Sequence, residues 1–383
     1  MATKRSIFEE VGSAAPPPPP KGGMIERGPR GARGLVRAWL GVLFALVVAM
    51  IAVGGLTRLT DSGLSITEWR PLTGALPPIG TEAWMREFAA YQQSPEFRLQ
   101  NSTMTLDAFK GIFWWEWSHR QLGRVIGLVW ALGFFGLWAL GRIPPGWKAR
   151  LLLLGVLGGA QGAIGWWMVA SGLTGSAVDV ASYRLATHLG LAFAILGLIA
   201  AQMLELGRSD AALMVARRAG EARLGAWAGW LAALAFAQVL LGALVAGIDA
   251  GRGFPTWPLM NGSFFPADAF VVPGGGAAWR AFFENPGLVQ FLHRLAGYAL
   301  LVAALFGWWR ARASAQPTIR AGFGAVALMA LAQATLGIFT ALYAAPLVLG
   351  LVHQLGAVVL WVLILRARAE ARAPHATSIR GSR

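Results

Sequence analysis

The sequence predicts an all-α polytopic membrane protein with eight transmembrane helices, arranged as two tandem, pseudo-symmetric four-helix bundles. Three observations predict this fold. The 383-residue chain is 56% hydrophobic and only 13% charged, whereas soluble domains carry about 25% charged residues. Eight of its segments are apolar over roughly the 20 residues that a bilayer-spanning helix needs. In addition, the second half of the chain repeats motifs of the first half.

The predicted transmembrane segments are separated by loops of unequal length. They lie near residues 36–57, 119–141, 150–170, 185–205, 225–247, 291–309, 321–342 and 348–366. The chain is accordingly divided into a disordered cytoplasmic tail (1–35), an N-terminal bundle (36–207), a cytoplasmic linker (208–224), a C-terminal bundle (225–366) and a second cytoplasmic tail (367–383).

The net charge of +15 follows the predicted topology. Lys and Arg collect in both tails and in the short loops, whereas the long loops 58–118 and 248–290 have few in comparison. This positive-inside pattern places both termini in the cytoplasm and the long loops outside. It explains the charge without nucleic acid as a partner. The N-terminal tail has no apolar signal core, so no cleaved targeting peptide is expected.

Two internal matches define the repeat. The segment 54–78, "GGLTRLTDSGLSITEWRPLTGALPP", aligns without gaps with 242–266 at an offset of 188 residues. The segment "EWSHRQLG" (116–123) aligns with "QFLHRLAG" (290–297), and "QGAIG" (161–165) corresponds to "QATLG" (333–337). An even number of helices in each half makes the two repeats parallel.

Four of the five histidines lie near the outer ends of alternate predicted helices: His119, His188, His293 and His353. An ionisable residue inside a transmembrane segment indicates a functional site. A single histidine could instead be hydrogen-bonded at the membrane interface. Four histidines, paired by the repeat and at one depth, favour two ligand sites.

Two histidines in each bundle suit some cofactors better than others. Zinc needs three or four ligands, copper sites often use sulfur or a third imidazole, and a di-iron site needs several carboxylates. The chain has no cysteine and only one Glu-x-x-His motif of this kind. Heme needs only its two axial positions filled, and histidine fills them. Nearby small residues would admit a flat macrocycle or allow close helix packing: Gly123, Gly190, Gly297 and Gly356.

The two halves differ beside the first histidine of each pair. Glu116 precedes His119 by three residues, whereas Gln290 precedes His293. Residues three apart on a helix are neighbours, so one half has a candidate catalytic carboxylate and the other has a neutral amide. The alternative is that Glu116 is favoured by the dipole at a helix N-terminus.

Several arginines are candidate contacts for the two heme propionates, because guanidinium groups pair with carboxylates bidentately. Arg120 and Arg294 directly follow the histidines, and Arg58 and Arg70 lie in the first outer loop. The alternative for the first two is lipid-headgroup binding or the snorkelling of a helix-end arginine.

The segments 54–78, "AFKGIFWWEWSHR" (108–120), "QGAIGWWMVASGL" (161–173) and "HQLGA" (353–357) resemble the heme A synthase family, in its Gram-negative and mitochondrial branch. The resemblance covers about residues 36–366. It implies that the pyrrole-ring C8 methyl of heme O is oxidised by successive hydroxylations to a formyl group, which gives heme A for terminal oxidases.

The resemblance also implies residue roles. Glu116 matches the family's essential glutamate, His119 and His188 match the ligands of the substrate heme O, and His293 and His353 match the axial ligands of heme B. A carboxylate there could stabilise a carbocation or position attacking water. The cysteine pair that some members carry in their outer loops is absent, so no loop disulfide can carry electrons.

The expected setting is the bacterial inner membrane, with both hemes toward the periplasm. Expected partners are heme O synthase, oxidase assembly factors and an unidentified electron acceptor or donor, and a homo-oligomer is possible. The competing functions are a diheme electron-transfer protein without substrate chemistry, and heme delivery or storage. The difference between Glu116 and Gln290 disfavours pure electron transfer.

Overall fold

A computed structural model of the chain describes residues 32–175 and 177–375. Eight of its helices are long and apolar enough to cross a membrane, and no named β-strand occurs within these residues, which confirms the predicted all-α membrane fold. The eight helices are α1 (Ala32–Leu59), α4 (Leu106–Ala139), α5 (Lys148–Gly172), α6 (Ser182–Leu206), α8 (Ala222–Gly247), α11 (Pro286–Ala311), α12 (Pro317–Leu342) and α13 (Leu347–Arg372).

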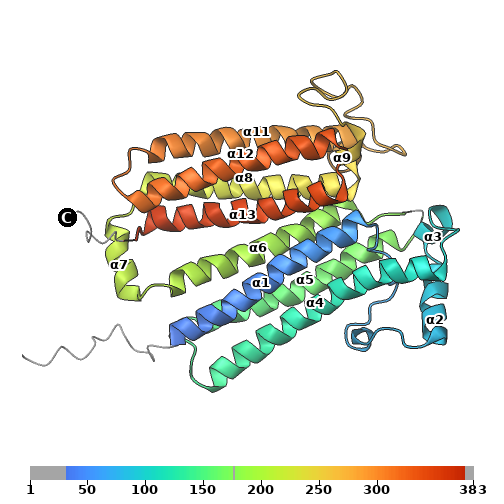
Figure 1. The fold of residues 1–383 in the computed structure, drawn as a ribbon, viewed down its shortest axis with the longest axis horizontal. Coiled ribbons are helices and arrows are strands. Elements are labelled where there is room, and N and C mark those ends of the chain that lie inside the picture. The colour runs from blue at the N-terminus through green and yellow to red at the C-terminus, as the bar shows by residue number, and fades with distance from the viewer. Residues whose placement is uncertain (1–31, 176, 376–383) are drawn as a thin grey trace, which may run out of the picture.

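Short helices occupy the connections between them. The first long loop contains η1 (Thr73–Ala75), α2 (Thr81–Tyr91) and α3 (Pro95–Leu99), and the second contains α9 (Ala250–Gly253), η2 (Ala278–Arg280) and α10 (Ala281–Glu284). In Figure 1 both long loops lie at one end of the molecule, and α7 (Asp210–Arg218) lies at the other. The predicted disordered stretch falls mostly on residues 1–31, which lie outside the described residues.

Helix α4 begins at Leu106, well before the predicted start at residue 119. The hydroxyl of Thr105 caps it by accepting a hydrogen bond from the backbone N–H of Ala108. The added turns bury Phe109 and Phe113 in an aromatic cluster with α2. This extension is stabilised by packing against the outer loop, so a search for a membrane-length apolar run does not detect it.

The predicted linker 208–224 is partly helical. Ser209 caps α7, with its side chain accepting from the backbone N–H of Ala212. The backbone N–H of Glu221 then donates to the carbonyl of Ala371, at 2.7 Å. That carbonyl lies in α13, which continues to Arg372 and so includes the first residues of the predicted tail 367–383.

The helix contacts fall into two groups. Helices α1, α4, α5 and α6 contact one another in chain order, and α6 closes the ring on α1. Helices α8, α11, α12 and α13 do the same, and the two groups lie side by side in Figure 1. Between them α6 packs on α8, α13 packs on α1, and α6 meets α13.

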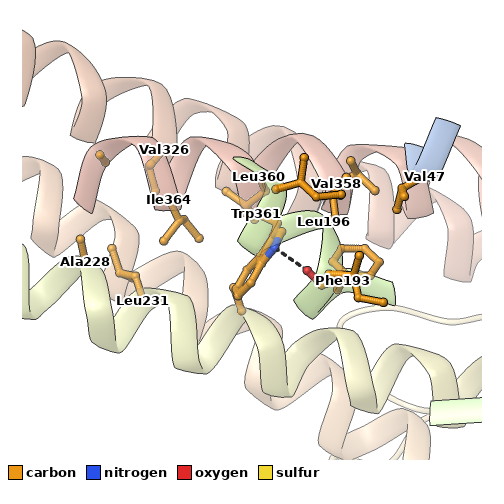
Figure 2. Close-up of a cluster of buried hydrophobic side chains, with 14 of the residues drawn as sticks. Val47, Phe193, Leu196, Ala228, Leu231, Val326, Val358, Leu360, Trp361 and Ile364 are labelled. Atoms are coloured by element: carbon orange, nitrogen blue, oxygen red, sulfur yellow. Dashed lines mark hydrogen bonds between the residues drawn. The ribbon is translucent and has the colours of Figure 1, made fainter. Parts of the chain in front are cut away.

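A continuous apolar core joins the two groups (Figure 2). It includes Trp361 of α13, whose indole N–H donates to the carbonyl of Phe193 in α6 at 3.1 Å. A Cβ atom at Gly197 would lie 2.8 Å from the same indole nitrogen. The indole therefore needs a glycine on α6 to reach its hydrogen-bond partner. The buried tryptophan fixes the two groups against each other.

Candidate functional site

The four predicted histidines come together as two pairs. His119 of α4 and His188 of α6 have ring centres 6.4 Å apart and ring planes 82° apart. His293 of α11 and His353 of α13 have ring centres 6.3 Å apart and planes 79° apart. The two halves of the chain thus build nearly the same arrangement from repeat-matched residues.

The spacing of each pair fits a heme. Imidazole nitrogens bind metal ions at about 2.0–2.1 Å, so two imidazoles on opposite sides of one iron have ring centres roughly 6 Å apart. Both pairs have this separation. In the part of the chain that the structure describes, no group of three or more His, Cys, Asp or Glu side chains could hold a metal ion. A two-imidazole site is what heme requires.

A glycine lies against each imidazole ring. A Cβ atom built at these glycines would meet the facing imidazole at 2.9 to 3.2 Å, which is closer than ordinary van der Waals contact. The glycines come from the odd-numbered transmembrane segments of each half: Gly54 of α1 faces His119, Gly165 of α5 faces His188, Gly242 of α8 faces His293 and Gly337 of α12 faces His353. Any other side chain at these positions would displace a candidate ligand.

The glycines predicted from the sequence do not lie against the imidazole rings. A Cβ at Gly123 would meet the methyl carbon of Met50 at 3.6 Å, and one at Gly297 would meet the amide nitrogen of Gln238 at 3.2 Å. Gly356 faces Gln333. These three make room for neighbouring side chains, whereas Gly190 packs against α8 between the two halves.

Three glutamines contact the histidines, and none of them was among the site residues predicted from the sequence. The side-chain amides of Gln161, Gln238 and Gln333 donate to the backbone carbonyls of His188, His293 and His353, at 3.0, 3.0 and 2.6 Å respectively. The detectable signal was the spacing Gln-x-x-x-Gly. It occurs at 161–165, 238–242 and 333–337 and places the glutamine one helical turn from the glycine on the same face.

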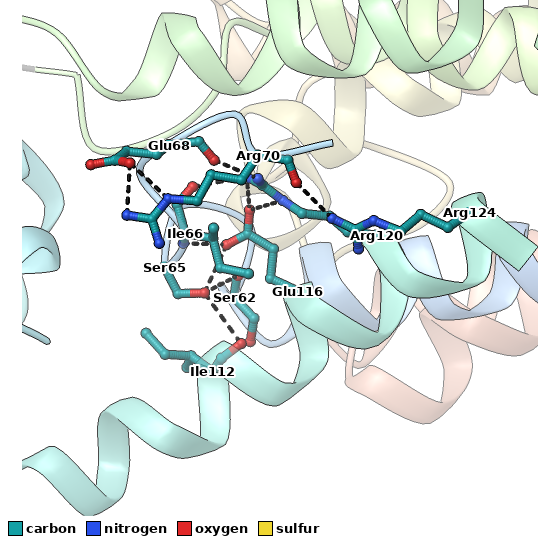
Figure 3. A network of polar contacts seen from close by, with 9 residues as sticks. All are labelled: Ser62, Ser65, Ile66, Glu68, Arg70, Ile112, Glu116, Arg120 and Arg124. Atoms are coloured by element: carbon teal, nitrogen blue, oxygen red, sulfur yellow. Dashed lines mark hydrogen bonds and ion pairs between the residues drawn. The ribbon is translucent and has the colours of Figure 1, made fainter. Parts of the chain in front are cut away.

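Glu116 is 2% exposed and fully hydrogen-bonded (Figure 3). Its Oε2 accepts from the hydroxyl of Ser65 and the backbone N–H of Ile66, both at 2.7 Å. Its Oε1 accepts from Nε and Nη2 of Arg120 at 3.1 and 2.6 Å. Two loop donors and one guanidinium therefore fix the position of this carboxylate.

The interpretation of Glu116 as a helix-end residue is wrong. Helix α4 starts at Leu106, and Asp107 is the acidic residue of its first turn. The helix dipole acts within the first turn, so it cannot explain a carboxylate that lies well inside the helix. The ion pair with Arg120 and the contact with the outer loop account for its burial.

Arg120 holds the outer loop as well as Glu116. Its Nη1 donates to the carbonyl of Glu68 at 3.0 Å, and its Nη2 donates to the carbonyl of Ile66 at 2.8 Å. The next arginine on α4, Arg124, donates to the carbonyls of Arg70 and Pro71. The loop beside the first histidine pair is therefore fastened to α4 through its backbone.

The second half repeats this arrangement without the carboxylate. Nη2 of Arg294 donates to the carbonyl of Phe254 at 2.8 Å, and Phe254 is the repeat counterpart of Ile66. Gln290, at the position of Glu116, is 3% exposed. Among the described residues, its Oε1 and the Nη1 of Arg294 are buried without a hydrogen-bond partner. One guanidinium nitrogen of Arg294 is thus available to a bound anion.

The other two candidate arginines pair with carboxylates of the protein. Arg58, at the outer end of α1, contacts Asp61 at 2.7 Å, Asp249 at 2.9 Å and Asp179 at 3.6 Å. Because Asp249 belongs to the second half, this arginine links the two halves. Arg70 is paired with Glu68 and Glu87, each at 2.7 Å, in the first outer loop.

A second buried carboxyl lies in the outer loop. Glu96, in α3, is 3% exposed, and burial raises its pKa to about 8 from an ordinary value of 4.5. A hydrogen bond with Tyr91 acts in the opposite direction, and the charge of Glu116 adds to the increase. The outer loop therefore contains a group that is protonated near neutral pH.

Comparison with known proteins identifies the family. The family model COX15-CtaA, described as cytochrome oxidase assembly protein, matches residues 37–365. The chain is 62% identical to a Dinoroseobacter shibae protein named heme A synthase, covering 100% of both chains. It is 60% identical to one from Cereibacter sphaeroides over 98% of each chain, and 59% identical to one from Paracoccus denitrificans over 99% of each. The chain belongs to the COX15-CtaA family of cytochrome oxidase assembly proteins.

Proposed function

We propose that this protein is a heme A synthase, an oxidoreductase that acts on a CH group of heme O. It oxidises the C8 methyl to a formyl group by successive hydroxylations and releases heme A for terminal oxidases. The observation that carries this proposal is a chemical difference between the two halves of the chain beside their histidine pairs. Both halves contain a heme-compatible histidine pair, but only the first has a buried carboxylate, Glu116, ion-paired beside it.

The two halves then have different tasks. His119 and His188 would bind the substrate heme O, and His293 and His353 would hold a resident heme B. Heme B when bound supplies one-electron redox chemistry. The neutral Gln290 in the second half suits a group that is held and not converted. An acceptor outside the chain must take up the electrons, because the chain has no cysteine to form a redox pair.

Glu116 acts on the substrate methyl as a preorganised carboxylate. Its four hydrogen bonds hold it in one place, so it needs little rearrangement when charge develops nearby. In that position it can stabilise positive charge at the methyl carbon, whereas to orient and deprotonate an attacking water molecule it would have to give up one of these four hydrogen bonds. The ring of Trp166, stacked near the guanidinium of Arg120 at 5.8 Å, lines the same region.

Among the arginines, Arg294 is the best candidate for a propionate contact, because its Nη1 has no partner in the described chain. Arg120 already binds Glu116 and two loop carbonyls. Arg58 and Arg70 are paired with carboxylates. Arg120 and Arg70 could contact a propionate only by sharing donors with their present partners. Arg58 also has one nitrogen without a partner, Nε, but unlike Arg294 it does not follow a candidate ligand in the sequence.

The orientation follows from charge. We place the end with α7, which carries Arg217 and Arg218, in the cytoplasm together with both termini. The long loops and both histidine pairs then face the periplasm of a bacterial inner membrane. Heme O synthase and oxidase assembly factors are the proposed partners, and self-association is compatible with the fold.

The test is the pigment bound to the purified protein, with and without a supply of heme O in the expressing cells. A synthase contains heme B together with heme O or heme A, and His293→Ala and His353→Ala remove the heme B. A diheme electron-transfer protein contains heme B in both halves and no heme A, whatever the supply of heme O. That result would reject the proposed function.

A further inference from the structure

Each histidine faces the same local motif on a neighbouring helix. The motif has a glycine that lies against the imidazole and a longer side chain four residues earlier. In three cases the sequence is Gln-x-x-x-Gly, at 161–165, 238–242 and 333–337. In the fourth case, facing His119, it is Met50-x-x-x-Gly54. At the constant offset of the repeat, Met50 is the counterpart of Gln238.

The three glutamines have similar contacts. Besides donating to the histidine backbone carbonyl, each amide nitrogen lies near the imidazole of the same histidine. The separations are 3.3 Å for Gln161 and 3.4 Å for Gln238, both to Nε2, and 3.1 Å for Gln333, to Nδ1. One amide therefore touches both the backbone and the ring of each of these histidines.

Several polar atoms around these contacts have no partner. Within the described residues, Oε1 of Gln161, Gln238 and Gln333 is buried without a partner, and so is Nδ1 of His188 and His293. An unsatisfied buried polar atom costs about 1–3 kcal/mol. A histidine that binds a metal through one ring nitrogen almost always donates its other N–H to an oxygen acceptor. Here the atom that faces each ring is the amide nitrogen, a donor, so the glutamine fixes the histidine through the hydrogen bond to its carbonyl and the contact with its ring.

Met50 occupies the matching place in the first half. Its methyl carbon lies 3.6 Å from a Cβ built at Gly123, just as the amide of Gln238 lies 3.2 Å from one built at Gly297. A thioether donates no hydrogen bond and is a weak acceptor. His119 is therefore the one candidate ligand, among the four described here, whose facing motif has no amide.

We propose that Gln161, Gln238 and Gln333 are positioning residues that fix the imidazoles of His188, His293 and His353, and that Met50 makes His119 the weakly fixed, exchangeable ligand. This inference rests on the proposed function. A resident heme B is held by two fixed ligands. Heme O must enter and heme A must leave, so the first half needs one ligand that releases readily, and that ligand is the one on the helix of Glu116.

The test exchanges the two repeat-matched residues. The variants are Gln238→Met and Met50→Gln in the full-length, heme-loaded protein. Methionine at position 238 is compatible with folding, because the chain already has methionine at the equivalent place. The matched control is Gln202→Met, which replaces a buried glutamine of α6 whose amide contacts the carbonyl of Arg150 at 3.4 Å and no histidine.

The measured quantity is the rate at which each heme transfers to excess apomyoglobin in detergent, followed separately for heme B and for heme O or A. Loss of a residue that orients a metal ligand typically weakens binding about 10–100-fold. Gln238→Met is expected to speed heme B loss by about that factor. Met50→Gln is expected to slow release from the first half comparably, and Gln202→Met should leave both rates unchanged.

A second readout separates positioning from general loosening. Loss of the amide that fixes the orientation of the imidazole alters the ligand field, so Gln238→Met should change the electron paramagnetic resonance g-values of heme B and leave those of the other heme as they are. Equal rates and spectra for Gln238→Met and Gln202→Met would overturn the role of the glutamine, and unchanged release in Met50→Gln would overturn the role of Met50. Absence of heme from both halves of the wild-type protein would instead refute the proposed function itself.

Discussion

Replacement of Glu116 by glutamine tests the central assignment most directly. Glutamine has nearly the same size, but one of the two oxygens becomes an NH2 group. That group must face either the guanidinium of Arg120 or the two donors Ser65 Oγ and Ile66 N–H. In either orientation a donor meets a donor, so the residue cannot keep all four hydrogen bonds.

The expected cost follows from these contacts. A hydrogen bond to a charged group contributes about 1.5–3 kcal/mol, and the side chains of Glu116 and Arg120 are only 3% and 20% exposed. We expect Glu116→Gln to destabilise the attachment of the loop around Ser65 and Ile66 by roughly 2–4 kcal/mol. The fold should survive, because the second half has glutamine next to arginine at the same positions, Gln290 and Arg294.

In free energy, the effect on catalysis should be about as large as the effect on stability. Loss of one preorganised electrostatic group costs about 10²–10³ in rate. The assay is chromatography of the pigments bound by the purified variant, combined with hydrogen exchange of the loop amides. We expect heme B to be retained, heme O or a hydroxylated intermediate to accumulate, and little heme A to form.

Ser65→Ala is the matched control. It removes one hydrogen bond from the same carboxylate and leaves the charge of Glu116 in place, so it should loosen the loop while most heme A formation continues. Near-normal heme A in Glu116→Gln would refute the catalytic role. Equal loss of heme A in both variants would show that Glu116 acts only by holding the loop.

Three further predictions follow from the structure. Because the pKa of Glu96 is raised to about 8 from 4.5, the folded state keeps a proton that the unfolded state has lost. Stability should therefore fall as pH rises from about 5 to 8, by up to about 1.4 kcal/mol per pH unit, and Glu96→Gln should flatten the melting temperature over this range. Arg58→Leu should destabilise the protein by about 1–3 kcal/mol in denaturant titration in detergent, because it breaks the link between the halves and the Arg58 side chain is only 13% exposed. Arg70→Leu should cost less than about 1 kcal/mol, because the Arg70 side chain is 43% exposed; equal effects would contradict this reasoning. Gly242→Ala places a methyl group 3.0 Å from the ring of His293 and should lower heme B content, while unchanged content and spectrum would show that the imidazole does not need the glycine.

The sequence by itself determined the features that depend on local composition and on the internal repeat. Hydropathy located all eight transmembrane segments, because a bilayer demands a long apolar run whatever its neighbours. The repeat made His293 the counterpart of His119 and His353 the counterpart of His188. In the structure, corresponding helices bring His119 next to His188 and His293 next to His353. The difference between Glu116 and Gln290 was also visible, because a gapless alignment needs no structure.

Only the tertiary structure decided which groups touch. The start of α4 at Leu106 depends on Phe109 and Phe113 packing against α2, and a short aromatic cluster of this kind does not produce an apolar run of membrane-spanning length. The partners of Arg58 and Arg120 likewise come from loops far away in sequence. A guanidinium can bind a propionate, a carboxylate or a carbonyl with similar geometry, so residue type alone could not select among them. The folded backbone selects the partner, because it determines which oxygen lies within reach.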